Sequence, residues 1–243
     1  MKGRIDYNKL ASEYAKHRQV HPEVLRCLLD QSGINSQSSV LEVGCGTGNY
    51  IVAVKRSINC SCWGIDPSNH MLAIARKASS MDIGFKIGSA DILDFPSESF
   101  DLVFSVDVIH HVNRYQTFFH EAYRILRTEG KICTVTDSEE IIRHRQPLST
   151  YFPETIEVDL NRYPPLNELI ESMNQIGFRS ISQDEVEFTY ALDTIQLYQD
   201  KAFSCLHLIS KESFIQGIEH MQKDIIHGPI PCVPRYALLW ASK

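Results

Sequence analysis

The stretch Val40-Leu-Glu-Val-Gly-Cys-Gly-Thr-Gly-Asn-Tyr50 constrains the fold of this 243-residue chain more than any other. Its first four residues are a short apolar run that predicts a buried strand, and glycines follow at positions 44, 46 and 48. A segment with helical character, Tyr50 to Lys55, comes next. A strand, a glycine turn and a helix are how α/β folds present bare backbone N–H groups to a ligand.

The residues inside this stretch narrow the kind of ligand. The glycine spacing is G-x-G-x-G, which differs from the G-x-G-x-x-G of dinucleotide-binding dehydrogenases. Glu42 lies two residues before the first glycine, at the carboxyl end of the predicted strand. A carboxylate at that place suits a cationic ligand and repels a pyrophosphate.

The pattern Glu-x-Gly-x-Gly-x-Gly after a strand resembles the first motif of class I S-adenosylmethionine (SAM) dependent methyltransferases, of the small-molecule, ubiquinone-biosynthesis-like type. This resemblance implies an α/β fold with a doubly wound, seven-stranded, mostly parallel Rossmann-like sheet and helical cap insertions in the C-terminal half. It implies SAM as cofactor and S-adenosylhomocysteine as product. Within the loop it implies cofactor contacts from Glu42, Gly44, Cys45, Gly46 and Gly48.

Asp66 lies 20 residues after Gly46, at the end of a second predicted strand, Cys60 to Ile65. A nucleotide-binding α/β unit places there the carboxylate that accepts hydrogen bonds from ribose hydroxyls. Asp66-Pro67 also has the character of a helix N-terminus, so capping is an alternative role that is compatible with the first. The resemblance adds Pro67 and Met71, from the following helix, to the cofactor site.

Three further stretches continue the resemblance in order. Gly88 to Pro96 is similar to the family's adenine loop and implies contacts from Ala90, Asp91 and Ile92, with Asp94 as a competing carboxylate. The strand Phe100 to Val106 is similar to the one beside the methionine portion and implies Ser105 and Val106. The predicted helix Asp6 to Arg18 resembles one that closes over the cofactor and implies Tyr14 and Arg18.

The sequence identifies no catalytic residue firmly. His110 and His111 open the loop after the fourth strand and are candidates for contacting the substrate or accepting a proton. Two histidines without acidic or cysteine partners do not predict a metal site. Methyl transfer needs no Ser-His-Asp or paired-carboxylate constellation, because a sulfonium methyl is already electrophilic. A general base is required only for a nucleophile that holds its proton.

A small-molecule acceptor with an O, N or C nucleophile is therefore predicted. The formal net charge of −6 disfavours nucleic acid as a partner. The basic residues Arg143, Arg145 and Arg162 would suit an anionic substrate or form a solvated loop. Two other functions stay open: a SAM-binding protein without catalysis, and an NAD(P)-dependent oxidoreductase, which shares Asp66 but is disfavoured by Glu42 and the glycine spacing.

The chain is predicted to be one domain over residues 1–243, with a cofactor-binding core at 6–137 and substrate-cap insertions at 138–165 and 192–230. Helices are expected over Asp193 to Leu208 and Ser210 to Ile226, the second capped by Ser210. Phe178 to Tyr190 and Tyr236 to Ala241 are expected strands. Gly130 is expected to allow a tight reversal before the strand that starts at Lys131.

Seven scattered cysteines, among them Cys60-Ser-Cys62, form no C-x-x-C or zinc pattern and predict reduced thiols in a cytoplasmic protein. The first residues show no signal-peptide core, and no apolar run approaches the roughly 20 residues that span a bilayer. The sequence gives no indication of the oligomeric state.

Overall fold

The computed structural model describes residues 16–17 and 19–243. Contacts along the chain gather into two compact units. The sheet unit contains Gln19–Thr136, Pro164–Val186 and Ala237–Lys243, and the helical unit contains Asp137–Tyr163 and Glu187–Tyr236 together with residues 16–17. The single domain, its 6–137 core and its two insertions stay a prediction, and each unit is described on its own.

A seven-stranded sheet organises the first unit, with strand order β3-β2-β1-β4-β5-β9-β6. Neighbouring strands from β3 to β5 run parallel, and β9 pairs with β5 in the antiparallel sense. This confirms the predicted doubly wound, mostly parallel sheet. The strands are β1 (Ser39–Val43), β2 (Ser61–Asp66), β3 (Gly84–Ile87), β4 (Phe100–Val106), β5 (Leu126–Thr136), β6 (Arg179–Glu187) and β9 (Arg235–Ser242).

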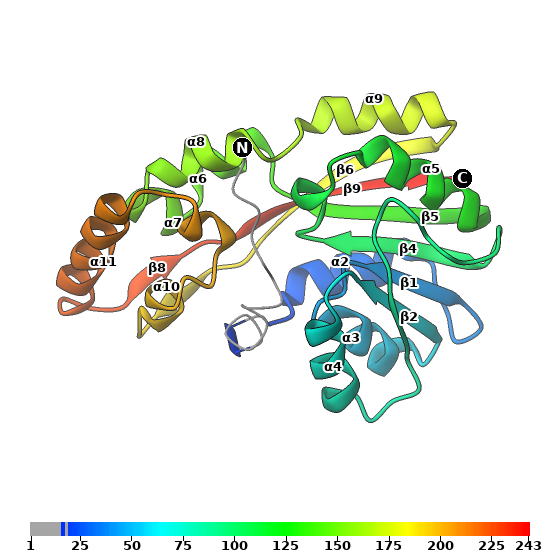
Figure 1. Cartoon of the computed structure of the whole chain (residues 1–243), viewed down its shortest axis with the longest axis horizontal. Helices are drawn as coiled ribbons and strands as arrows, with labels where there is room; N and C mark the ends of the chain where they lie inside the picture. The colour runs from blue at the N-terminus through cyan, green and yellow to red at the C-terminus, as the bar shows by residue number, and fades with distance from the viewer. Residues whose placement is uncertain (1–15, 18) are drawn as a thin grey trace. The chain divides into compact units, whose positions relative to one another are not determined.

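Helices cover both faces of this sheet: α5 and α9 lie on one side, and α2, α3 and α4 on the other (Figure 1). Side chains alternate along β1, so Leu41 and Val43 pack against Phe118 and Leu169 of the first pair in one buried cluster. Glu42 points to the opposite face, toward α3. The helices are α2 (Pro22–Ser32), α3 (Asn49–Ile58), α4 (Asn69–Ala78), η1 (Ile109–His111), α5 (Tyr115–Ile125) and α9 (Leu166–Ile176).

The turn at Gly130 differs in detail from the expectation. Gly130 is not itself left-handed, since β5 already begins at Leu126 and the residue in the left-handed region is Glu129, with φ 64°. Gly130 is instead required for space, because a Cβ there would come within 2.8 Å of the carbonyl oxygen of Arg127. The turn predicted from glycine therefore exists, but one residue earlier.

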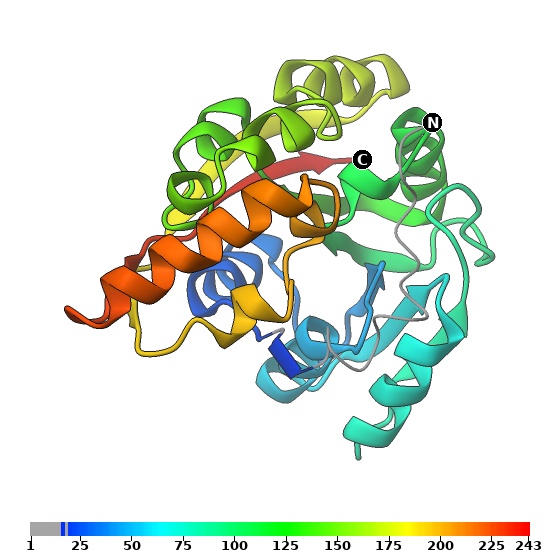
Figure 2. The same ribbon diagram turned by 60° about the vertical axis from the view of Figure 1, so that its left-hand side comes forward.

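The helical unit consists of short elements around its own apolar cluster, which includes Phe152, Tyr198 and Met221. Figure 2 shows α11, in orange, as its longest helix. The elements are α6 (Glu139–His144), α7 (Leu148–Tyr151), α8 (Glu154–Leu160), β7 (Tyr190–Leu192), α10 (Gln196–Gln199), η2 (Ser204–His207), α11 (Lys211–Ile225) and β8 (Ile230–Cys232), with β7 and β8 antiparallel.

The predicted continuous helix over Asp193 to Leu208 is wrong, because α10 ends after one turn. Lys201 has φ 51°, in the left-handed region, and Phe203 is extended before η2 begins. The second prediction is confirmed: Ser210 caps α11, its Oγ accepting from the backbone N–H of Ser213 at 3.1 Å.

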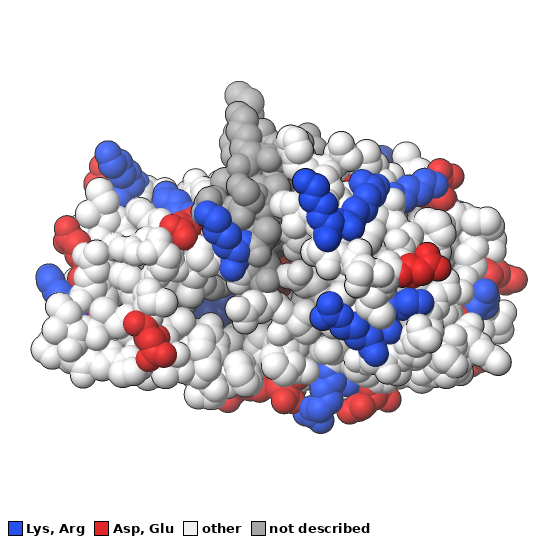
Figure 3. Space-filling view, turned by 90° about the horizontal axis from the view of Figure 1, so that it is seen from below, with Lys and Arg blue, Asp and Glu red and all other residues white. Residues whose placement is uncertain are grey.

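Two surface properties bear on the partners of the protein. Among the described residues, no helix combines the length and the apolar character needed to cross a bilayer. On the face drawn in Figure 3, Lys and Arg side chains stand in small groups that white surface and acidic side chains separate.

Gly217 generates a stability prediction for the helical unit. An alanine Cβ at this buried position would come within 2.6 Å of the carbonyl oxygen of Tyr151 and would overlap the ring of Phe152. Overpacking costs about 1–3 kcal/mol, against a gain in helix propensity of ~1 kcal/mol. We expect Gly217→Ala to lower the midpoint of thermal unfolding, whereas the exposed neighbour variant Gln216→Ala should match the wild type. A stabilised Gly217→Ala protein would contradict the close approach of α7 and α11.

Candidate active site

The glycine loop lies at the carboxyl ends of three adjacent strands. β1 pairs with β2 on one side and with β4 on the other, so the ends of these strands meet at one edge of the sheet. The backbone N–H groups of Gly44 and Cys45 both donate to the carbonyl of Ile65, at 2.8 and 2.9 Å. The loop is therefore fixed to the end of β2, next to Asp66. Open α/β sheets bind ligands at such a point, where the chain order changes direction.

Asp66 holds two backbone segments together. Its Oδ2 accepts from the N–H of Gly46 at 2.9 Å, and its Oδ1 accepts from the N–H of Ser68 at 2.8 Å. The helix cap of α4 is a different residue, Ser68, whose Oγ accepts from the N–H of Met71. Only 9% of Asp66 is exposed, and burial raises the pKa of its carboxyl despite these two hydrogen bonds.

Gly46 leaves open space beside this carboxylate. Its φ of 51° lies in the left-handed region, and apart from its chain neighbours no heavy atom of the described residues lies within 4 Å of the position that a Cβ would take. The two flanking glycines differ, because a Cβ at Gly44 would overlap Val108 and one at Gly48 would lie 3.2 Å from Phe85. Gly46 is thus the one loop glycine at which bare backbone faces a free volume.

Glu42 is buried under the first turn of α3, with 3% of its surface exposed. Its Oε2 accepts from the backbone N–H of Ile51 at 2.9 Å. Burial raises the pKa of this carboxyl well above its usual value, the hydrogen bond from Ile51 acts in the opposite direction, and the nearby charge of Asp66 raises it further. The partner on α3 was not foreseen in the sequence.

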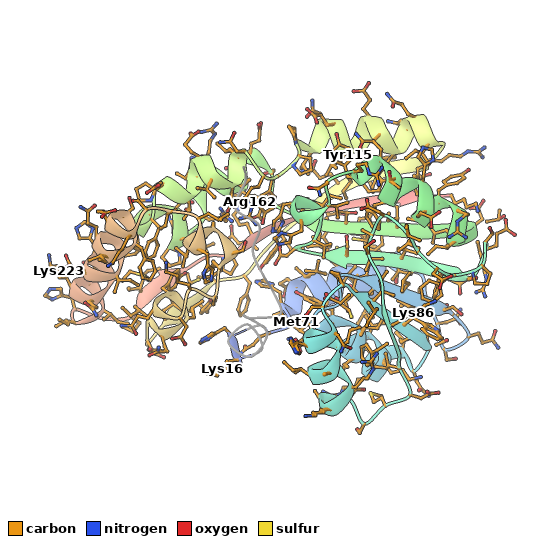
Figure 4. The ribbon with its side chains drawn as sticks, in the orientation of Figure 1. Lys16, Met71, Lys86, Tyr115, Arg162 and Lys223 are labelled. Atoms are coloured by element: carbon orange, nitrogen blue, oxygen red, sulfur yellow. The ribbon has the colours of Figure 1, made fainter. Side chains whose placement is uncertain are left out.

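The predicted adenine loop follows β3. One carboxylate oxygen of Asp91, Oδ1, is buried and has no hydrogen-bond partner among the described residues. The N–H of Ile92 donates to the carbonyl of Ser89 at 3.2 Å, while its side chain is 70% exposed. The competing carboxylate Asp94 is exposed and pairs with Lys86, which Figure 4 labels.

The predicted contacts at the end of β4 are buried or half-buried, and a left-handed residue follows them. Ser105 is fully buried and Val106 is half-buried. Asp107, which comes next, adopts a left-handed backbone with φ 56°, and its N–H donates to the carbonyl of Val135. In η1 the rings of His110 and His111 are in contact, with their centroids 3.9 Å apart and their planes tilted by 50°; His110 is half-buried and His111 is exposed.

His21 and Asp107 lie near the loop and had not been predicted as site residues. The backbone N–H of His21, before α2, donates to the hydroxyl of Tyr50, in the first turn of α3, at 3.0 Å. Burial lowers the pKa of the His21 imidazole, and the charge of Asp107 acts against this shift. Asp107 itself had a sequence signal, because aspartate is among the few residues that tolerate a left-handed backbone at a strand end.

The remaining predicted contacts are four residues that the structure describes and two that it does not. Pro67 is exposed, and Met71, labelled in Figure 4, is buried on α4. Cys45 is buried and Ala90 is half-buried. Tyr14 and Arg18 lie outside the described residues. His17, between them, pairs with Asp200 of the helical unit through Nε2 and Oδ2 at 2.7 Å.

The basic residues that suggested an anionic substrate are engaged within the helical unit. Arg145 donates to Asp137 at 3.1 Å and to Asp159 at 2.6 Å. Arg162, labelled in Figure 4, donates to the other oxygen of Asp159 at 2.9 Å and to Ser204 at 3.0 Å. Asp159 is 2% exposed, so both arginines belong to an internal ion-pair network. Arg143 is exposed.

Similarity to known proteins agrees with this geometry. The model of a family described as a methyltransferase domain matches residues 41–134. A demethylmenaquinone methyltransferase of Anoxybacillus flavithermus is 22% identical over 214 residues, covering 76% of this chain and 90% of that protein. A crystal structure described as a methyltransferase from an antibiotic biosynthesis pathway of Anabaena variabilis has a TM-score of 0.72 at 22% identity, covering 93% of this chain and 99% of that one. Residues 41–134 therefore form a methyltransferase domain, and the similarities support a class I SAM-dependent methyltransferase.

The methyltransferase fold is shared by proteins with other activities. The cyclase SpnF superposes with a TM-score of 0.63 at 18% identity, covering 98% of this chain and 93% of that one. A likeness at this level shows the fold alone. The acceptor of this methyltransferase therefore has to be argued from its own residues.

The buried carboxyl of Glu42 gives a prediction about stability. Because its pKa is raised in the folded protein, its contribution is most favourable below the ordinary pKa of glutamate and is lost as pH rises. We expect Glu42→Gln, which can still accept from Ile51, to be more stable than the wild type at pH 8, by a margin that is smaller at pH 5. Each pH unit can change the difference by up to about 1.4 kcal/mol.

Thermal unfolding at the two pH values measures this difference. Glu219→Gln, at an exposed site on α11, is the matched control and should follow the wild type at both. A difference between Glu42→Gln and wild type that does not grow with pH would show that Glu42 carries no burial penalty.

Proposed function

We propose that this methyltransferase transfers the methyl group of SAM to a small molecule through an O, N or C nucleophile. The observation that carries the proposal is the bond from the N–H of Gly46 to Asp66. It sets a buried carboxylate beside the free volume at Gly46, where a bound nucleoside would meet both bare backbone and a strong acceptor.

The other carboxylates support assigning SAM to this edge of the sheet. Asp66 would accept from the ribose hydroxyls, and the unpartnered Oδ1 of Asp91 would accept from the adenine amine. Glu42 would act on the ammonium group, directly or through water. The remaining proposed cofactor contacts are Tyr14, Arg18, Gly44, Cys45, Gly48, Pro67, Met71, Ala90, Ile92, Ser105 and Val106. At Ile92 the proposal requires the N–H to leave Ser89 or to share its hydrogen bond.

Bound SAM supplies an electrophilic methyl group, which leaves the protein to hold it in line with the acceptor. Orientation of this kind can lower a barrier by roughly 7–11 kcal/mol. Glu42 and Asp66 would do so by fixing the ammonium group and the ribose to the ends of β1 and β2, two strands that pair in a continuous parallel register. This assigns catalysis to geometry more than to any acid or base.

His110 and His111 remain the candidates for the acceptor side. They follow the strand whose end carries Ser105, and their adjacent, tilted rings present one half-buried and one exposed imidazole. Either could orient the acceptor or take its proton as transfer proceeds. Among the described residues no three His, Cys, Asp or Glu side chains gather in a way that could hold a metal ion.

The size of the acceptor is the part of the proposal that rests on similarity and charge. The relative from Anoxybacillus flavithermus is named for a quinone-type small molecule, demethylmenaquinone. The excess of acidic residues disfavours a nucleic acid.

All seven cysteines are free thiols, which supports the predicted cytoplasmic location.

A second function is a SAM-binding protein that does not transfer the methyl group. The shared fold of the cyclase SpnF supports keeping it, because this architecture also serves a reaction of another kind. An NAD(P)-dependent oxidoreductase is disfavoured further by the buried Glu42, which would face a pyrophosphate.

The cofactor assignment predicts the effect of Asp66→Ala. The loss of charge-assisted hydrogen bonds of roughly 1.5–3 kcal/mol each should weaken S-adenosylhomocysteine binding at least about tenfold in titration calorimetry. Asp94→Ala removes an exposed carboxylate from the adenine loop and should leave the affinity unchanged. NAD should give no binding. Equal affinity of wild type and folded Asp66→Ala would remove Asp66 from the site.

The reaction itself is tested by methyl transfer into a cell extract. SAM carrying a labelled methyl group is incubated with the extract and the protein, and the products are separated by size. We expect label in the low-mass fraction, and much less with Asp66→Ala at the same SAM concentration. Label only in protein or RNA would overturn the small-molecule acceptor, and saturable S-adenosylhomocysteine binding without any transfer would favour the second function.

A further inference from the structure

Cys60 and Cys62 bring two thiols together at the end of the sheet opposite to the glycine loop. Their Sγ atoms are 3.5 Å apart and hydrogen-bonded. Cys60 ends the connection from α3, and Cys62 is the second residue of β2, so the two side chains leave the same face of an extended segment. The exposed fractions are 1% for Cys60 and 3% for Cys62.

The two thiols are not equivalent. The hydrogen bond from Cys62 lowers the pKa of Cys60, burial acts against this, and the Lys55 ammonium lowers it further. The same hydrogen bond and burial raise the pKa of Cys62. Lys55 is held close, because its Nζ donates to the carbonyl of Cys60 at 2.8 Å. The charged groups that face Cys60 are thus Lys55 on α3 and Asp101 on β4, and the cation favours a thiolate.

A metal ion does not explain the pair. Structural zinc needs four ligands, and among the described residues no third His, Cys, Asp or Glu joins the two thiols. A disulfide fits better. Two residues of extended chain separate Cα atoms by roughly 6.6 Å, which lies within but near the limit of the ~4.4–6.8 Å range of disulfides. A bond formed at that limit is strained and readily reduced.

We propose that Cys60 and Cys62 are a site of reversible oxidation, at which hydrogen peroxide converts the dithiol to an intramolecular disulfide. The Cys60 thiolate attacks one peroxide oxygen, the O–O bond breaks, and hydroxide leaves and takes up a proton to become water. The resulting sulfenic acid is attacked by the Cys62 sulfur, which forms the S–S bond and releases a second water. Two thiols and one peroxide thus give one disulfide and two waters.

Cys60 is itself buried, but it lies in the chain between exposed residues. Its neighbours Asn59 and Ser61 are both exposed, and the turn that contains them joins α3 to β2. Cys133, inside β5, is equally buried and differs in its protonation, since burial raises its pKa well above the usual value and the charge of Asp184 acts in the same direction. A thiol that stays protonated is a poor nucleophile.

The test treats the folded, reduced protein with a small excess of hydrogen peroxide, blocks the remaining thiols with iodoacetamide and maps the peptides by mass spectrometry. The expected result is a peptide that has lost two hydrogen atoms, with neither Cys60 nor Cys62 alkylated, and full recovery of both thiols after dithiothreitol. The rate should rise with pH, because the thiolate is the nucleophile.

Single substitutions assign the roles. Cys62→Ser should leave a sulfenic acid on Cys60 that a dimedone probe traps, and Cys60→Ser should form no disulfide and oxidise at Cys62 at least tenfold more slowly than Cys60 does in Cys62→Ser. Cys133→Ser, the matched control, should form the disulfide at the wild-type rate. Alkylation of both Cys60 and Cys62 after peroxide treatment of the wild type, or a disulfide mapped elsewhere, would overturn the proposal even if a variant failed to fold.

Discussion

The proposed cofactor edge is the edge of the sheet formed by the carboxyl ends of β1 and β2. Its architecture depends on the hydrogen bond between the Glu42 carboxylate and the backbone N–H of Ile51. This bond connects the end of β1 to the start of α3, and the glycine loop is the chain between them. The positive end of the helix dipole stabilises the carboxylate only in part, because burial still raises its pKa. An apolar residue could fill this place without that penalty. A carboxyl group at this position is therefore better explained by the proposed binding of the cofactor than by folding.

The two units of the chain are held together by different kinds of contact. In the sheet unit, backbone atoms and buried carboxylates from β1 and β2 are locked by hydrogen bonds such as those of Asp66, so the proposed cofactor residues have little freedom. The helical unit has its own apolar cluster and its own ion pairs, built from short elements. A transfer reaction that relies on orientation needs one rigid partner, and a rigid cofactor edge leaves the acceptor side free to differ between relatives with different substrates.

Sequence reasoning succeeded where the signal is local. A strand followed by glycines and a serine before a helix depend on neighbouring residues, and β1 and the Ser210 cap follow from them. The spacing of 20 residues also put Asp66 at the end of β2, while its role toward the ribose stays a prediction. Sequence reasoning failed where distant contacts decide. The single helix over Asp193 to Leu208 is broken at Lys201, and the partner of Glu42 on α3 needed the folded geometry. The near contact of Cys60 and Cys62 was visible as a spacing, but their shared face and the nearby Lys55 were not.

The ion pairs of the helical unit also limit how an acceptor can be recognised. Asp159 accepts from Arg145 and Arg162 at once, and Asp137 completes a set of two anions and two cations. Removing one partner of a buried pair costs about 3–5 kcal/mol, because the other charge is left uncompensated. An anionic acceptor that drew either arginine away from Asp159 would have to overcome that cost. Recognition of a negatively charged substrate by these two residues is therefore disfavoured, although their number and position in the sequence suggested it.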